Sequence, residues 1–178
     1  MKPAKSFAHV FAQLLSWVSL GSDKIESLTP EQAKRLVTEF KGEYLFINGL
    51  TKLDAASAKA LAKLKGEGLF LSGLTTLNDD IAKVLAESTA WDGWLPHITA
   101  LDSPDSVAIA QALAARKGPL ALPNLEQISP KTLTALLGKR DIEIPPVETL
   151  DLIAEPDGSP TEDFVIPEWL AEQNKGRR

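Results

Sequence analysis

Aliphatic residues recur along the chain in one spaced pattern, in which two alternate and two more follow at intervals of three. Residues 43–53 read EYLFINGLTKL and residues 67–77 read EGLFLSGLTTL, and the two stretches are identical at seven of eleven positions. The pattern comprises Leu45, Ile47, Leu50 and Leu53; Leu69, Leu71, Leu74 and Leu77; Leu95, Ile98 and Leu101, with Gly93 at the first position; Leu120, Leu122, Leu125 and Ile128; and Ile142, Ile144, Val147 and Leu150. The two quoted stretches begin 24 residues apart (67 − 43). A period of about this length indicates stacked units, none of which can bury its apolar face alone.

A second pattern follows each unit's last aliphatic residue. The next position holds Thr29, Asp54, Asn78, Asp102 or Ser129, all of which are residue types that cap a helix N-terminus. Proline follows at Pro30, Pro104 and Pro130, as it often does in the first turn of a helix. Each unit is therefore predicted to be a short strand, a turn and a helix of about three turns. Identical connections place the strands parallel, with the helices on the opposite side.

These units resemble the leucine-rich-repeat superfamily, in a short bacterial-type variant, over about residues 25–150. The resemblance rests on Leu45, Ile47 and Leu50 and their counterparts in the later units. The sequence departs from the family where Asn or Cys usually follows the strand, because aliphatic residues occupy that position here and no internal Asn ladder can form. The resemblance implies an α/β solenoid that acts as a non-catalytic scaffold and binds another protein.

The chain divides into three parts on these patterns. Residues 1–24 are predicted to form a helical N-terminal cap, residues 25–154 a solenoid of about five units, and residues 155–178 an acidic loop and a C-terminal tail. Phe7, Phe11, Leu14 and Val18 recur at helical spacing, which favours a folded cap over a secretion signal, although the segment loosely resembles such a signal.

Alternation along the strands predicts an aromatic row on the sheet face. If Leu45 and Ile47 point inwards, then Phe46 points outwards, and the matching positions hold Phe70 and Trp94. The predicted protein-binding residues are Tyr44, Phe46, Phe70, Asp92, Trp94, Glu143 and Trp169. Exposed aromatic rows often mark interaction sites. Two alternatives stay open: the N-terminal helix or the C-terminal tail covers the row, or the rings only stabilise the sheet.

The tryptophans carry open alternatives of their own. Trp91 and Trp94 either fill volume inside the protein or form the centre of a recognition site. Trp169 either docks on the solenoid as a cap or serves as a short linear motif. The acidic residues Asp141 and Glu143 lie at the far end of the sheet face. They either bind a basic patch on a partner or form an acidic edge that contacts only solvent.

Composition narrows the functional class further. The net charge is −5 with Lys and Arg scattered along the sequence, which argues against nucleic-acid binding. The chain has no cysteine, and its two histidines, His9 and His97, are too far apart in sequence for a helix-borne metal site. His97, Ser103 and either Asp102 or Asp105 could be imagined as a catalytic triad, but the sequence around Ser103 does not resemble a nucleophile elbow. We therefore expect no enzyme activity, metal or cofactor.

The expected function is a protein-binding module that is a monomer on its own, cytoplasmic or alternatively secreted, with no membrane contact. Its partner cannot be named from the sequence. The alternatives are a structural subunit, held in a larger assembly through its helical face or C-terminal tail, and a secreted effector.

Overall fold

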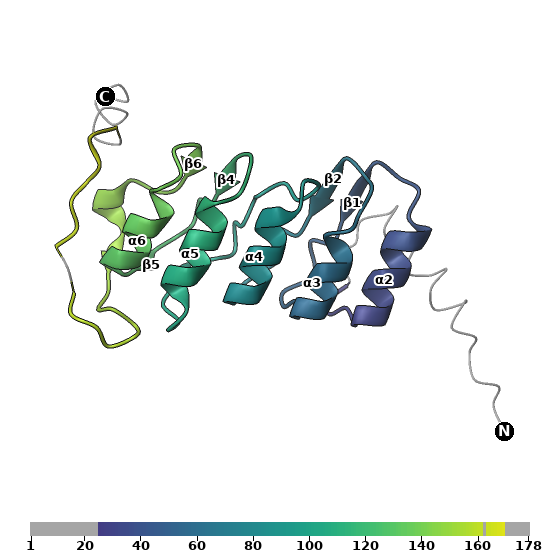
Figure 1. The fold of residues 1–178 in the computed structure, drawn as a ribbon, viewed down its shortest axis with the longest axis horizontal. Coiled ribbons are helices and arrows are strands. Elements are labelled where there is room, and N and C mark those ends of the chain that lie inside the picture. The colour runs from purple at the N-terminus through teal and green to yellow at the C-terminus, as the bar shows by residue number, and fades with distance from the viewer. Residues whose placement is uncertain (1–24, 162, 170–178) are drawn as a thin grey trace.

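Helices and short parallel strands alternate along the part of the chain that the computed structural model describes, residues 25–161 and 163–169. This part is a mixed α/β structure in which the strands form small sheets (Figure 1). The helical cap expected in residues 1–24 lies outside the described residues.

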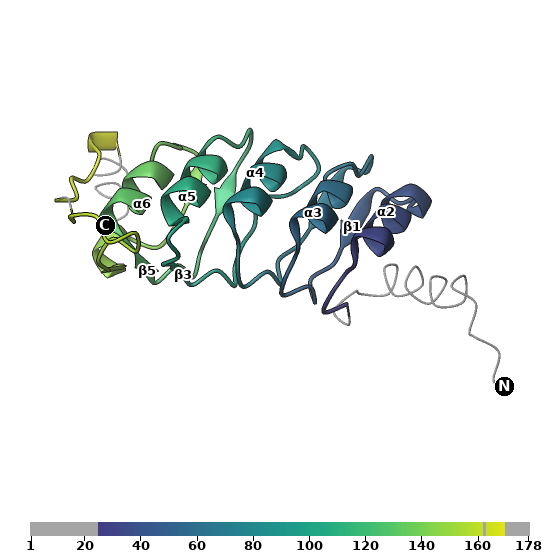
Figure 2. The same cartoon turned by 60° about the horizontal axis from the view of Figure 1, so that its bottom comes forward.

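The helices form one side of the molecule. They are α2 (Pro30–Glu39), α3 (Ala55–Leu61), α4 (Asp79–Glu87), α5 (Ser106–Ala114) and α6 (Pro130–Leu136). They lie in a row in chain order, and each contacts the next (Figures 1 and 2). The apolar stripe of each helix is buried, for example Ala33 and Leu36 in α2, so the stripes face the interior together.

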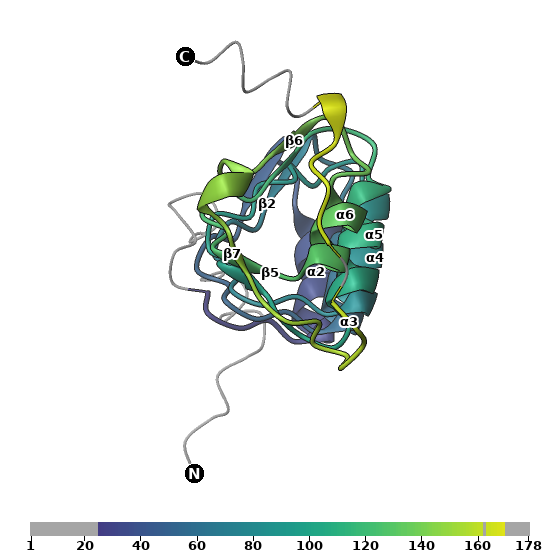
Figure 3. The ribbon, with the colours of Figure 1, turned by 90° about the vertical axis from the view of Figure 1, so that its left-hand side faces the viewer.

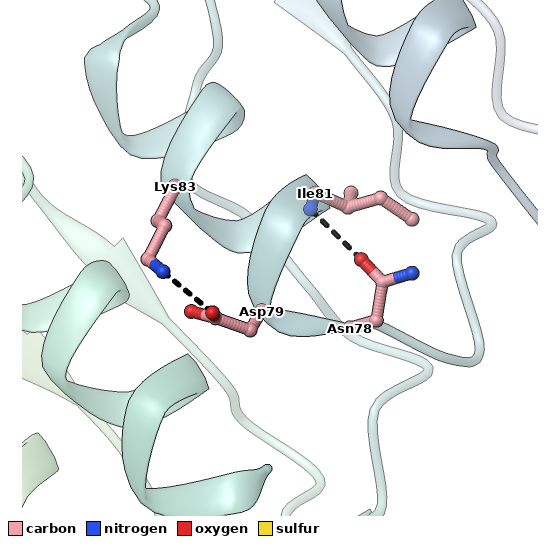
Figure 4. A network of polar contacts seen from close by, with 4 residues as sticks. All are labelled: Asn78, Asp79, Ile81 and Lys83. Atoms are coloured by element: carbon pink, nitrogen blue, oxygen red, sulfur yellow. Dashed lines mark hydrogen bonds and ion pairs between the residues drawn. The ribbon is translucent and has the colours of Figure 1, made fainter.

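Four of the five predicted helix caps are confirmed. Thr29 and Gln32 form a capping box at α2, and the side chains of Asp54 and Ser129 accept backbone N–H bonds at α3 and α6. Asn78 accepts from the N–H of Ile81 at α4, beside an ion pair between Asp79 and Lys83 (Figure 4).

The predicted cap Asp102 is wrong. Helix α5 begins at Ser106 after Asp105, which makes no side-chain capping bond. The intervening residues form a turn, in which the N–H of Ser106 donates to the carbonyl of Ser103. The last aliphatic residues of the third and fourth units, Leu101 and Ile128, are 27 residues apart (128 − 101). Part of this longer spacing forms the turn before α5 rather than helix.

The strands lie in three small parallel sheets. One pairs β1 (Tyr44–Phe46) with β2 (Gly68–Phe70), and another pairs β4 (Leu120–Ala121) with β6 (Ile142–Glu143). These are predicted strands. The third sheet joins β3 (Ala100–Leu101), β5 (Gln127–Ile128) and β7 (Asp151–Leu152). Strands β3 and β5 hold the last aliphatic residues of the third and fourth units, and β7 directly follows Leu150. The view along the row shows helices on one side and strands β5 and β7 at a corner away from β2 and β6 (Figure 3).

The core runs through every unit between the strands and the helices. Ile47, Leu71, Leu95 and Leu122, which hold the same position in four units, are all 0% exposed. Their counterpart Ile144 in the last unit is only partly buried. A short 3₁₀-helix, η1 (Val147–Thr149), follows it and begins at the third aliphatic position of this unit.

Candidate functional site

Three aromatic rings gather on the outer face of β1 and β2. The parallel register sets Tyr44 beside Gly68 and Phe46 beside Phe70. The rings of Phe46 and Phe70 stack at 4.4 Å with an interplanar angle of 13°, and Tyr44 lies tilted 6.3 Å from Phe70. Tyr44 is 48% exposed and Phe46 40%. We call Tyr44, Phe46 and Phe70 the aromatic strip.

Two neighbours hold the aromatic strip in place. A Cβ atom at Gly68 would lie 2.8 Å from ring atoms of both Tyr44 and Phe70, so the close approach of the rings requires glycine there. The hydroxyl of Tyr44 donates to Oε2 of Glu67 at 2.8 Å, and this bond to a carboxylate raises the pKa of Tyr44. The strip is thus ordered although it is open to solvent.

Trp94 does not continue the strip in the predicted register. The bridge from the second unit runs from Leu69 to Trp91, while Trp94 pairs with Ala121 of the fourth unit. Trp91, rather than Gly93, therefore takes the first apolar position, and it is buried at 1% exposure. Between the two tryptophans the chain turns through Gly93 at φ 79°. Of the two alternatives for these tryptophans, Trp91 fills volume, and Trp94 is 40% exposed on the outer face.

A buried cationic pair lies behind this turn, and sequence reasoning missed it. The guanidinium of Arg116 lies 5.1 Å from the Trp91 ring centroid and donates to the carbonyls of Trp91 and Lys117. The ammonium of Lys139 donates to the carbonyl of Arg116 and to Asp141, both at 2.8 Å. A weak signal existed, because Arg116 and Lys139 both follow helix ends in successive units.

An open groove of about 330 Å³ adjoins Trp94 on the face of β4 and β6. Its lining includes Asp92, Trp94, Arg140, Asp141 and Glu143. Burial raises the pKa of Asp92, whereas the hydrogen bond from Lys139 lowers the pKa of Asp141. We call this the Trp94 groove. It brings three of the predicted site residues together, Asp92, Trp94 and Glu143, and the aromatic strip on β1 and β2 holds three others.

His97 belongs to a row of polar contacts between successive turns. The hydroxyl of Ser72 donates to Oδ1 of Asn48 at 2.6 Å, and Nδ1 of His97 lies 2.7 Å from the carbonyl oxygen of Ser72. A carbonyl can only accept, so Nδ1 carries the proton. In the following unit the amide of Asn124 donates to the carbonyl of Pro96. These contacts link turn to turn, and they give His97 a structural role.

The C-terminal segment closes the far end of the core. Phe164 and Trp169 pack against the core, which favours docking for Trp169. The carboxylate of Glu155, which is 5% exposed, accepts from the N–H of Lys131 in the first turn of α6. The segment therefore covers the last unit and leaves the aromatic strip open.

Two features are absent from the described residues: a cluster of metal-ligating side chains and a membrane-spanning helix. No group of three or more His, Asp or Glu side chains in residues 25–161 and 163–169 is placed to hold a metal ion. Within the same ranges, no helix is both long and apolar enough to cross a bilayer. No family model, curated protein or solved structure matches the chain.

Proposed function

We propose that the protein is a non-catalytic binding module that engages another protein through its strand face. The observation that carries this proposal is the exposure of Tyr44, Phe46 and Trp94, each at least 40%, on the side away from the helices. Buried aromatic anchors supply much of the binding energy of typical interfaces. Large rings that are already ordered lose little entropy on binding, which favours such a role.

We propose further that the architecture is a solenoid of the leucine-rich-repeat type. The parallel register of β1 with β2 and the contacts between successive helices support it. The polar contacts from Asn48 to Ser72 and from Ser72 to His97 support it too, because they replace the missing Asn ladder between turns.

The two parts of the face suit different features of a partner. The aromatic strip offers ring faces and edges for apolar side chains. The Trp94 groove offers a ring beside the carboxylate of Glu143, which suits a Lys or Arg side chain, whereas Asp141 is already paired with Lys139. A partner segment with apolar residues followed by a basic residue matches this order.

The test is capture of the partner by a double variant, Phe46→Ser with Trp94→Ser. Both side chains point outwards, so we expect circular dichroism and the melting temperature to stay close to those of the parent. Loss of one anchor costs about 2 kcal/mol, roughly 30-fold in affinity, and the double variant should lose the partner. Affinity capture from the native cell with quantitative mass spectrometry measures this.

Leu152→Ser is the matched control, because Leu152 is 44% exposed but lies in the third sheet. At least one protein should be captured by the parent and this control and be lost with the double variant. If every captured protein is retained by the double variant, the strand face is not the binding site. If the double variant melts far below the parent, the rings serve the protein's own stability.

A further inference from the structure

A wide groove lies on the opposite side of the molecule, between α2 and α3. It measures about 630 Å³ and is formed where the two helices end. Its apolar lining comprises Val37, Phe40, Ala60 and Leu64, of which Val37 and Phe40 are only partly buried. The apolar floor means that the groove offers more than charge to whatever binds there.

Lysine side chains surround this floor. Lys34, Lys41, Lys59, Lys63 and Lys65 line the groove, and no acidic residue does. All five are exposed, and within the described residues none of their ammonium groups has an ion pair or hydrogen bond. Lys59 lies in the last turn of α3, where it complements the helix dipole, but this does not account for the other four. In a chain of net charge −5, this is a strong local excess of positive charge.

The chain carries a segment of opposite charge at its other end. Residues 155–168 contain five acidic residues and no Lys, Arg or His, and of the five Glu155 is buried against α6. In this segment Val165 is 80% exposed and Ile166 40%, although the flanking Phe164 and Trp169 pack against the core. Asp163 and Glu168 are exposed beside them. The segment therefore presents acidic and apolar side chains together, which complement the lysines and the apolar floor of the groove.

The geometry points to head-to-tail association of this chain, in which the α2/α3 groove of one molecule binds the acidic segment of a second copy. The segment cannot reach its own groove, because α4, α5 and α6 lie between them and Trp169 fixes it at its own end (Figure 1). The undescribed ends of the chain do not suit the groove either. Residues 1–24 carry three Lys and one Asp, and residues 170–178 carry one Lys, two Arg and one Glu, so both are basic.

Such an association joins two different surfaces, so it extends from molecule to molecule unless the rotation closes a ring. It depends on exposed charges, which salt screens within about 8 Å at physiological ionic strength. We therefore expect weak, concentration-dependent assembly at low salt and monomers at high salt, in place of the simple monomer expected from the sequence.

Two neutralising variants of the full chain test the proposal by analytical ultracentrifugation, from about 10 µM to 1 mM. The groove variant is Lys59→Gln with Lys63→Gln, and the segment variant is Asp163→Asn with Glu168→Gln. A control, Lys52→Gln with Lys117→Gln, removes the same charge from exposed lysines elsewhere. At low salt the parent and the control should assemble, and each of the two variants should stay monomeric.

Mixing the two variants gives the sharpest outcome. The groove variant keeps an intact segment and the segment variant an intact groove, so the mixture should form 1:1 dimers and nothing larger. A parent that stays monomeric at 1 mM and low salt overturns the proposal, as does a mixture that stays monomeric. Assembly that survives in the groove variant also overturns it, because another surface is then responsible. Circular dichroism of each variant checks that the fold is intact.

Discussion

At the scale of single residues, a few polar side chains tie neighbouring units together through the buried interior. Ser57 is 0% exposed, and its hydroxyl lies 2.6 Å from Oδ2 of Asp54 and 3.0 Å from the carbonyl oxygen of Leu28 in the preceding unit. Ser106 and Thr132 make a similar buried contact at 2.8 Å between α5 and α6. These bonds satisfy polar groups that would be costly to bury unpaired.

Asp54 gives a prediction about pH. Hydrogen bonds from the side chain and then the backbone of Ser57 lower its pKa below the ordinary value of 3.8. A lowered folded-state pKa means that the stabilisation is fully present above the unfolded-state value and is lost as pH falls through the folded-state value. Asp54→Ala should therefore cost about 1 kcal/mol of unfolding free energy at pH 7, as lost caps do, and less at pH 3, which lies below the ordinary value.

Urea unfolding at the two pH values measures this effect. Asp102→Ala is the matched control, because Asp102 is exposed and caps no helix. It should change the unfolding free energy by less than about 0.5 kcal/mol. An Asp54→Ala deficit of the same size at pH 3 as at pH 7 would show that the carboxylate charge is not what stabilises α3.

At the scale of elements, the sequence predicts helices and inward strand positions well, because both depend on local periodicity. The caps Thr29, Asp54, Asn78 and Ser129 were identified because capping is a contact within one turn of chain. The third sheet was missed, since β3 and β5 each hold a single aliphatic residue of the repeat, Leu101 or Ile128, and so show no alternation. The start of α5 was missed because Asp102 and Asp105 are the same residue type, and only the tertiary fold selects between them.

The sequence predicted which aromatic residues of the candidate site are exposed better than it predicted how those residues are arranged. Tyr44 and Phe46 are exposed as expected, because their strand has the regular pattern. Trp94 is exposed too, but the chain is two residues longer from Trp91 to Leu95 than from Leu69 to Leu71. This bulge at residues 91–94 shifts the pairing of Trp94 to the next unit. The lysine groove was missed altogether, because lysines scattered along the sequence are brought together by the packing of α2 against α3.

Gly93 gives a prediction at the bulge. A Cβ atom there would lie 2.3 Å from the carbonyl oxygen of Pro119, and its φ of 79° strains any L-residue. Gly93→Ala should lower the unfolding free energy by more than about 2 kcal/mol, because strain of about 1–3 kcal/mol adds to a backbone clash. Gly158→Ala is the control, since Gly158 has a similar φ of 74° and nothing within 4 Å. Equal losses in chemical denaturation would mean that the approach of Pro119 is relieved at no cost.

At the scale of the whole molecule, one apolar cluster joins all the units. It includes Leu36 at one end and Leu150 at the other, with Leu71 in the middle at 0% exposure. Since each unit buries its face only against its neighbours, no unit has a core of its own. The described part of the chain should therefore unfold as a single cooperative structure.

Leu71→Ala tests this cooperativity. It should lower the unfolding free energy by about 2–5 kcal/mol, as removal of a fully buried leucine does. Far-UV circular dichroism and tryptophan fluorescence should report one shared, shifted transition. The exposed Leu152→Ala should cost less than about 1 kcal/mol. Two separate transitions in Leu71→Ala would mean that the two ends of the cluster fold independently.

The bulge at residues 91–94 also bears on how the gene can change. Strands β1 and β2 pair residue for residue, so a tandem duplicate of residues 43–66 would lie between two strands of the same register. The third unit is different, because it offers Trp91 to the unit before it and Trp94 to the unit after it. It therefore acts as an adapter, because it pairs through different residues with the units before it and the units after it. We therefore expect that a gain or loss of whole units would leave residues 91–94 in a single copy.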